Sequence, residues 1–161
     1  MGFTTSWTPT QHLSLVTLLC HEYEEALSFY AGLLNFTIHD DSEVEDSGAE
    51  PGKRFIVLTP PKLTQMAPMV GLRVTRAVTR RQQKAVGNQA GDAVFLFFEV
   101  DNFDEAYGKM KSMGVKFLEE KPREEKFGRA VLFQDPYGNR INLVDRPTQR
   151  TGSLYAKDTS V

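Results

Sequence analysis

The chain has 161 residues, of which 40% are hydrophobic and 25% charged, a composition typical of a globular protein with its own core. Its formal net charge of -2 argues against the basic footprint of a nucleic-acid-binding protein. No run approaches the ~20 apolar residues of a membrane span, and no secretory signal is visible. We therefore expect a cytoplasmic protein with neither a nucleic-acid nor a membrane partner.

The first half of the chain predicts the order strand, helix and three further strands. An apolar run predicts a strand over 13–20, and apolar residues at helical spacing predict a helix over about 22–33. Cys20, the single cysteine, lies in the first strand, and we interpret it as a buried structural thiol. The three further strands are expected in NFTIH, KRFIVLTPP (53–61) and MVGLRVTRA (69–77).

The second half repeats this order after a polar segment, 79–92, which we interpret as a linker. A shift of 80 residues places a strand at 93–101 and a helix over about 102–113 on their counterparts in the first half. Gly114 is expected to end that helix in the left-handed conformation. The remaining strands are expected in VKFLEE, RAVLFQ (129–134) and RINLVD (140–145). Two copies of one βαβββ unit follow, each completing the core of the other.

The segment DPYGN, residues 135–139, predicts the connection between the last two strands. Asp135, Pro136 and Gly138 stand at the positions that these residue types prefer in a type I turn. The turn therefore predicts an antiparallel hairpin.

Together these features resemble the vicinal oxygen chelate superfamily, which includes glyoxalase I, bleomycin-resistance proteins, fosfomycin-resistance enzymes and extradiol dioxygenases. The resemblance lies in the doubled unit and in the phrases LVTLLCHEYEEALSFYAGLLNF, FFEVDNFDEAYGKMKSMGV and FQDPYGNRINLVD. It implies an α+β fold in which paired βαβββ modules form a curled, cup-shaped mixed sheet flanked by helices. It also implies a single domain over 1–147, with modules at about 12–78 and 93–147, followed by a polar tail at 148–161.

The resemblance further implies the positions at which such proteins hold a divalent metal. The usual ligands, a histidine on the first strand of each module and a carboxylate on the last strand, map onto Leu15, Phe95 and Asn142. Leucine and phenylalanine cannot coordinate a metal, and a neutral amide is a weak donor for Zn²⁺, Mn²⁺ or Fe²⁺. We therefore expect no metal and no other cofactor. A relocated site stays open as an alternative, built from His12, His21 and His39.

Alternation along the strands predicts which side chains line the cup. Facing Leu15 and Phe95 inward also turns Thr17, Phe97 and Glu99 toward the ligand space. The two strands of the hairpin add further members, Arg54 is a candidate for holding an anion, and Gln89 could reach over the mouth of the cup. The expected ligand-binding residues are Leu15, Thr17, Arg54, Gln89, Phe95, Phe97, Leu132, Gln134 and Asn142. The alternative is that Phe95 and Phe97 fill this space as core.

Two classes of function fit this set of residues. The first is a glyoxalase/bleomycin-resistance-like protein that binds a small apolar or aromatic molecule in the cup without the usual metal, as a sequestering or carrier protein. The second is a metal-independent isomerase, lyase or cyclase for a carbonyl or phenolic substrate, with Glu99 and Asn142 as candidate catalytic residues. A metal-dependent lyase or dioxygenase is a third alternative, and glyoxalase I activity is not expected. The resemblance implies a homodimer.

Overall fold

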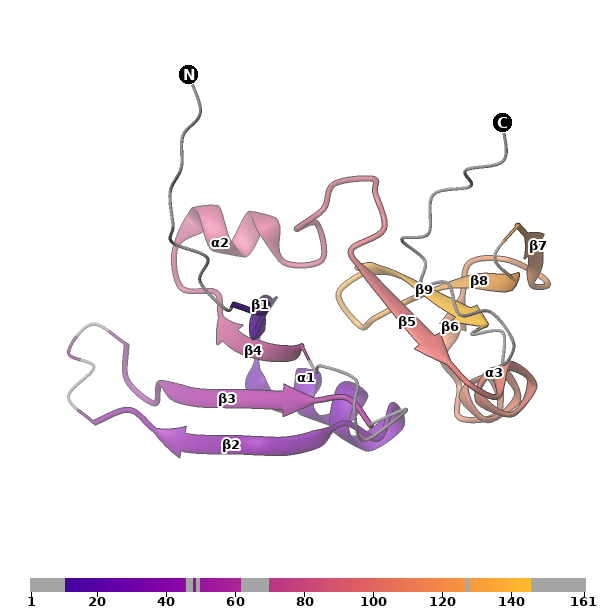
Figure 1. The fold of residues 1–161 in the computed structure, drawn as a ribbon. Coiled ribbons are helices and arrows are strands. Elements are labelled where there is room, and N and C mark those ends of the chain that lie inside the picture. Colours follow the sequence, from indigo (N-terminus) through magenta and orange to yellow (C-terminus); the bar gives the residue numbers. More distant parts are fainter. Residues whose placement is uncertain (1–10, 46–47, 49, 62–69, 127, 146–161) are drawn as a thin grey trace, which may run out of the picture.

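The computed structural model describes residues 11–45, 48, 50–61, 70–126 and 128–145, which form two mixed β-sheets with helices (Figure 1). The expected tail at 148–161 lies outside the described residues. The elements are β1 (Leu15–Cys20), α1 (Tyr23–Leu27), the π-helix η1 (Ser28–Leu33), β2 (Thr37–Glu43), β3 (Arg54–Thr59), β4 (Gly71–Arg76), α2 (Arg80–Ala85), β5 (Leu96–Val100), α3 (Phe103–Ser112), β6 (Lys116–Phe117), β7 (Arg123–Glu125), β8 (Gly128–Gln134) and β9 (Arg140–Asp145).

Both sheets have the same strand order, as the internal repeat predicts. The first sheet runs β1-β4-β3-β2, and the second runs β5-β9-β8-β6 with β7 also paired to β8. In each sheet the first and last strands of the unit are parallel, and the other neighbours are antiparallel. The two sheets lie side by side in Figure 1, with α1 and η1 between them. The predicted α+β fold of two βαβββ units is confirmed.

The predicted helix over about 22–33 changes its hydrogen-bond pattern halfway. It begins as α1 and continues from Ser28 as the wider η1, where the Leu34 N–H donates to the Phe29 carbonyl at 3.0 Å. The apolar residues of the helix at this spacing are buried at Tyr23, Ala26, Leu27 and Tyr30, with Ala26 and Tyr30 fully inaccessible to solvent, and partly buried at Leu33. The π-helical turn thus keeps the apolar face against the core while the chain enters β2.

The polar segment 79–92, interpreted as a linker, contains a helix that the apolar pattern of the sequence did not indicate. The N-terminus of α2 is closed by a capping box, in which the Thr79 hydroxyl accepts from the Gln82 N–H at 3.1 Å. The Gln82 side chain in turn accepts from the Thr79 N–H at 3.0 Å. None of the residues of α2 is buried, so capping rather than an apolar stripe identifies this helix.

A buried hydrogen-bond network joins the two units. The Tyr30 hydroxyl of η1 donates to Oδ2 of Asp135 at 2.8 Å, and Asp135 is only 3% exposed. Asn139 Nδ2 donates to the same oxygen at 2.8 Å, while the N–H groups of Tyr137 and Asn139 donate to Oδ1 at 2.9 Å. Burial, with the Asp135 carboxylate beside it, raises the pKa of the Tyr30 hydroxyl well above its usual value, so this group remains a neutral donor.

Aromatic rings continue the junction into one shared core. Phe36 of the first unit contacts Phe98 of the second with ring centroids 5.5 Å apart, and Phe98 contacts Phe133 at 6.0 Å. Tyr30 meets Phe36 edge to face at 5.8 Å, which ties this aromatic row to the polar network. The two units therefore stabilise one core, as the repeat predicts.

Segment 79–92 packs against the hairpin turn of the second unit. The Gly138 N–H donates to the Asp135 carbonyl at 3.1 Å, which confirms the predicted turn. Gly87 approaches this turn so closely that a Cβ atom there would lie 1.8 Å from the carbonyl oxygen of Tyr137. Its φ of 73° is also left-handed, so glycine is required for two reasons.

We expect Gly87→Ala to lower the free energy of unfolding by about 3–5 kcal/mol, because backbone strain and overpacking add together. Gly91→Ala is the matched control, since Gly91 has a φ of 62° but no atom within 4 Å of its Cβ position. That variant should lose only about 1–2 kcal/mol. Urea unfolding of both variants measures the difference, and equal losses would contradict the close approach.

We expect Tyr30→Phe to lower the free energy of unfolding by about 1–3 kcal/mol, because the buried Asp135 carboxylate loses a donor. Tyr107→Phe should stay within about 0.5 kcal/mol of the parent, since no described residue hydrogen-bonds the Tyr107 hydroxyl. Chemical denaturation compares the two variants. A Tyr30→Phe variant as stable as Tyr107→Phe would show that the network does not hold the units together.

Candidate functional site

Each sheet has one face covered by helices and one face turned away from them, which we call the open face. Leu18 and Cys20 of β1 and Ile141 and Leu143 of β9 belong to the core on the covered side. Side chains alternate along a strand, so the residues between them point to the open faces. The strand registers extend this assignment to neighbouring strands, because paired residues share a face.

The open face of the first sheet carries two of the predicted ligand-binding residues, Leu15 and Thr17. Thr17 is in register with Arg73 of β4, which is in register with Val57 of β3. Leu15 is 39% exposed and packs against Gly71, where an added Cβ atom would meet its Cδ2 at 3.0 Å. Arg73 was not among the predicted residues, although its register with Thr17 brings it to the same face.

The open face of the second sheet brings together the largest group of predicted residues. Phe97 is in register with Asn142, which is in register with Leu132, and Phe97 is 58% exposed. Glu99 and Gln134 share this face because each stands two residues along its strand from one of these side chains. A prominent aromatic ring, a carboxylate and two amides thus occupy neighbouring strands, as the alternation predicts.

Phe95 takes a different place from Phe97. It precedes β5, where its N–H donates to the Arg140 carbonyl at 2.8 Å. Its side chain is partly buried and packs against the hydrophobic core. Phe95 therefore follows the core-filling alternative, whereas Phe97 does not.

Two predicted residues, Arg54 and Gln89, are engaged elsewhere. Arg54 lies on the helix-covered face, where its Nε and Nη2 donate to Asp41 at 2.8 and 2.6 Å and its Nη1 pairs with Glu24. The bond from Arg54 lowers the pKa of Asp41. The Arg54 guanidinium therefore points away from the open face. The Gln89 amide binds the backbone of β1 instead of reaching over a ligand space: it accepts from the Leu19 N–H at 2.8 Å and donates to the Thr17 carbonyl at 2.9 Å.

Asn142 has the least favourable polar environment on the open face of the second sheet. It is only 5% exposed, and its Oδ1 has no hydrogen-bond partner in the part of the chain that the structure describes. An unpaired buried polar atom costs about 1–3 kcal/mol of stability. Such a cost is typical of residues retained for binding rather than for folding.

The donor set at the family's metal positions does not fit a divalent ion. Leu15 and Phe95 offer only hydrocarbon, and Asn142 offers one neutral oxygen. Within the described ranges, no group of three or more His, Cys, Asp or Glu side chains is arranged to hold a metal ion. His12, His21 and His39 belong to no such group within those ranges.

Cys20 does not supply a nucleophile. Its side chain is buried and unpaired with another cysteine. Burial raises the pKa of the thiol to about 12, so the group stays protonated at neutral pH. The interpretation of Cys20 as a buried structural thiol agrees with this environment.

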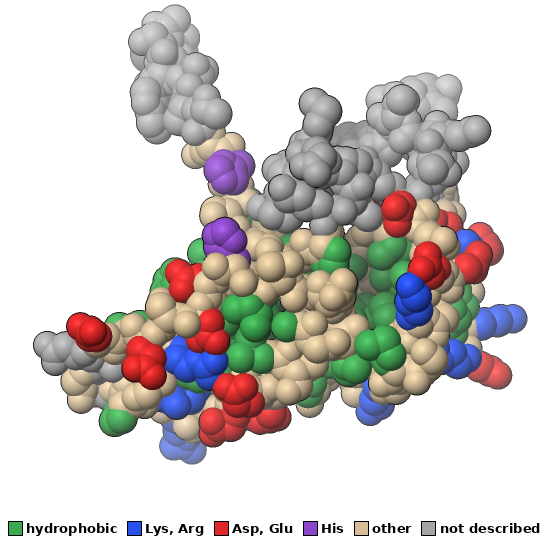
Figure 2. All heavy atoms as spheres, turned by 90° about the horizontal axis from the view of Figure 1, so that it is seen from below, with side chains coloured by type: hydrophobic (Ala, Val, Ile, Leu, Met, Phe, Trp, Pro, Cys, Tyr) green, Lys and Arg blue, Asp and Glu red, His purple; other side chains and the backbone are tan. Residues whose placement is uncertain are grey.

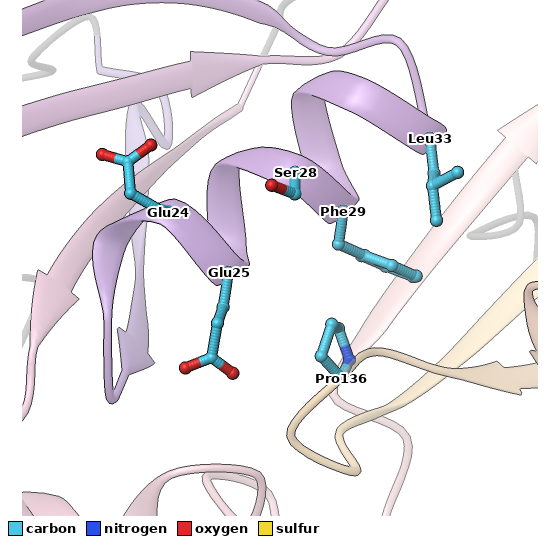
Figure 3. A pocket seen from close by; sticks show the side chains of 6 residues that line it. All are labelled: Glu24, Glu25, Ser28, Phe29, Leu33 and Pro136. Atoms are coloured by element: carbon cyan, nitrogen blue, oxygen red, sulfur yellow. The ribbon is translucent and has the colours of Figure 1, made fainter.

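A hollow of about 630 Å³ lies away from the open faces, between α1 with η1 and the hairpin turn (Figure 3). Its lining combines two carboxylates with apolar side chains: Glu24, Glu25, Ser28, Phe29, Leu33 and Pro136. None of the predicted ligand-binding residues lines it. The hollow is wide and shallow. Its lining places no cation, histidine or cysteine beside the two carboxylates, so it does not resemble a reaction centre.

The surface mixes charge with apolar patches. Figure 2 shows acidic and basic side chains interspersed around one face of the molecule, with hydrophobic side chains exposed among them. No helix among the described residues has the length and apolar character needed to cross a membrane.

Comparisons with known proteins agree with this architecture. The sequence model of the Glyoxalase/Bleomycin resistance protein/Dioxygenase superfamily matches residues 12–143. An uncharacterized protein of Shewanella frigidimarina (strain NCIMB 400) is 35% identical over 134 residues, which cover 83% of this chain and 93% of that protein.

Two solved structures share the fold at low sequence identity. UcmS2 superposes with a TM-score of 0.68 at 20% identity, over 84% of this chain and 98% of that one. TnmS3, an antibiotic binding protein from Streptomyces sp. CB03234, superposes with a TM-score of 0.66 at 19% identity, over 88% of this chain and all of that one. At such identities the likeness extends to the fold alone.

We expect Asn142→Val to leave the free energy of unfolding unchanged or to raise it by about 1–3 kcal/mol, because it removes an unpaired buried amide. Asn139→Val is the matched control, since Asn139 is 2% exposed and its Oδ1 is also unpaired among the described residues, but its Nδ2 donates to Asp135. That variant should lose about 2–3 kcal/mol. Urea unfolding distinguishes them, and a marked loss for Asn142→Val would show that its amide supports the fold.

Proposed function

Since the chain belongs to the Glyoxalase/Bleomycin resistance protein/Dioxygenase superfamily, we propose that it binds a small apolar or aromatic molecule at the open faces of its sheets. It acts as a sequestering or carrier protein and works without the divalent metal of related enzymes. The observation that carries this proposal is the pairing of an exposed ring, Phe97, with a buried amide that has no described partner, Asn142.

The chemistry of the open faces suits such a ligand. Small-molecule sites are mostly apolar and contain a few polar groups that orient the ligand. Leu15, Phe97 and Leu132 supply apolar surface, while Thr17, Gln134 and Asn142 supply hydroxyl and amide groups. TnmS3, which shares this fold, is an antibiotic binding protein, so the binding of a small molecule is a function that the fold can support.

The absence of suitable donors supports binding without a metal. The family's ligand positions carry Leu15, Phe95 and Asn142, which together offer one neutral oxygen. A ligand would then be held by stacking, apolar contact and hydrogen bonds from the chain itself. Arg54 and Gln89 are not part of this site, because both are engaged elsewhere.

A homodimer in the cytoplasm is part of the proposal. Leu13 and Leu15 of the first unit and Phe97 of the second are 65%, 39% and 58% exposed, and exposed apolar side chains of this size are typical of an interaction surface. A second copy that covers the open faces would bury them and enclose a bound ligand. Analytical ultracentrifugation would measure this assembly, and a monomer at micromolar concentration would exclude it.

A metal-independent isomerase, lyase or cyclase is the second candidate. Glu99 and Asn142 lie on the same open face of adjacent strands, so a carboxylate and an amide flank one ligand position. An enzyme of this kind would change the ligand, whereas a carrier releases it intact. Mass spectrometry of the ligand after incubation with the protein and with its Glu99→Gln variant separates the two functions.

We expect Phe97→Ala to weaken binding of the best compound from a thermal-shift screen of aromatic antibiotics and metabolites by roughly tenfold, because stacking and apolar contact are lost. Met113→Ala is the control, since Met113 is 44% exposed at the end of α3. Isothermal titration calorimetry with and without EDTA measures both effects. Unchanged binding by Phe97→Ala, or loss of binding in EDTA, would contradict the proposed site.

A further inference from the structure

Arg73 is a charged residue on the open face of the first sheet that takes no part in the proposed function. It lies on β4, in register with Thr17 and Val57. Its guanidinium carbon is 4.1 Å from the centroid of the Phe55 ring, and Phe55 is 37% exposed. The guanidinium and the ring thus form a stacked platform on the open face of the first sheet.

The charge of Arg73 is not neutralised by any carboxylate in the described part of the chain. Its Nη1 donates to two backbone carbonyls, those of Val74 at 2.8 Å and Arg54 at 3.5 Å. By contrast, Arg54, Arg123 and Arg129 each pair with two carboxylates. The Nε and Nη2 donors of Arg73 therefore have no partner among the described residues.

The nearest acidic position on this face is too distant to pair with Arg73. Asp40 is in register with Val57, which places it two strands away from Arg73, about 10 Å across the sheet. Asp41 lies on the covered face with Arg54. The backbone carbonyls of Arg54 and Val74 hold Nη1, and none of the described residues bonds the other edge of the planar guanidinium, which has the geometry to bind a planar anion.

The internal repeat gives Arg73 a counterpart in the second unit. Thr17 matches Phe97 under the shift of 80 residues, and their register partners on the last strands are Arg73 and Asn142. At equivalent places the two units therefore present a cation beside Phe55 and a neutral amide beside Phe97. A cation at one of these equivalent positions and a neutral amide at the other suit a ligand that carries both an anionic group and a neutral polar group.

We propose that the open face of the first sheet binds an aromatic carboxylate, with its ring beside Phe55 and its carboxylate accepting from Nε and Nη2 of Arg73. Guanidinium and carboxylate groups match in geometry and form charge-assisted hydrogen bonds. The anion site rests on the proposed function, because it assigns a charge to the same apolar or aromatic ligand.

The test uses 2-naphthoate, 9-anthracenecarboxylate and 1-pyrenecarboxylate, each paired with its neutral carboxamide. We expect the full chain to bind at least one acid roughly tenfold or more tightly than its amide in fluorescence titrations, because a charged hydrogen bond is gained. Arg73→Met and Arg73→Gln should bind acid and amide equally. Retained amide binding shows that these variants are folded. Arg80→Met, which removes the same charge from α2, should keep the preference.

Each other result has one meaning. Equal binding of acid and amide by the parent protein overturns the anion site and leaves the proposed function standing. A preference for the acid that survives in both Arg73 variants places the anion elsewhere and also overturns the inference. Failure to bind any acid or amide overturns both the anion site and the proposed function.

Discussion

The hydrogen bond from Tyr30 to Asp135 is the contact on which the arrangement of the two units depends. A buried carboxylate is stable only when several donors surround it, and Asp135 collects four from the turn, from Asn139 and from η1. The same turn fixes the register of β8 against β9. A slip of one residue there would exchange the faces of Ile141 and Asn142, so the junction of the units also determines which side chains a ligand meets.

Much of the fold could be predicted because its determinants are local or repeated. Helical spacing around Tyr30, the turn at Asp135 and the left-handed Gly114, with a φ of 84°, each agree with the structure. The α2 helix was missed because it has no apolar stripe, although T-R-R-Q is a capping-box sequence. The short β7 was missed because a charged edge strand is defined by its partner β8 rather than by its own pattern.

The candidate site was predictable only where alternation decides the outcome. Phe97, Leu132 and Asn142 share a face because the period of a strand is two, and the turn sets their pairing. Arg54 depends instead on Glu24 and Asp41, which lie 30 and 13 residues away in sequence. The position of Arg73 on the open face could have been predicted, since matching the last strands of the two units places it at the position equivalent to Asn142.

The side chain of Gln89 has a consequence for how this protein meets other chains. By occupying the Leu19 N–H and the Thr17 carbonyl, it closes the outer edge of β1, which would otherwise present free backbone groups. Such an edge is a template for adding a foreign strand, the first step toward fibrous aggregates. The Gln89 amide thus protects this edge from pairing with another strand. A protein that binds at this end of the sheet would contact side chains instead of extending the sheet through backbone hydrogen bonds.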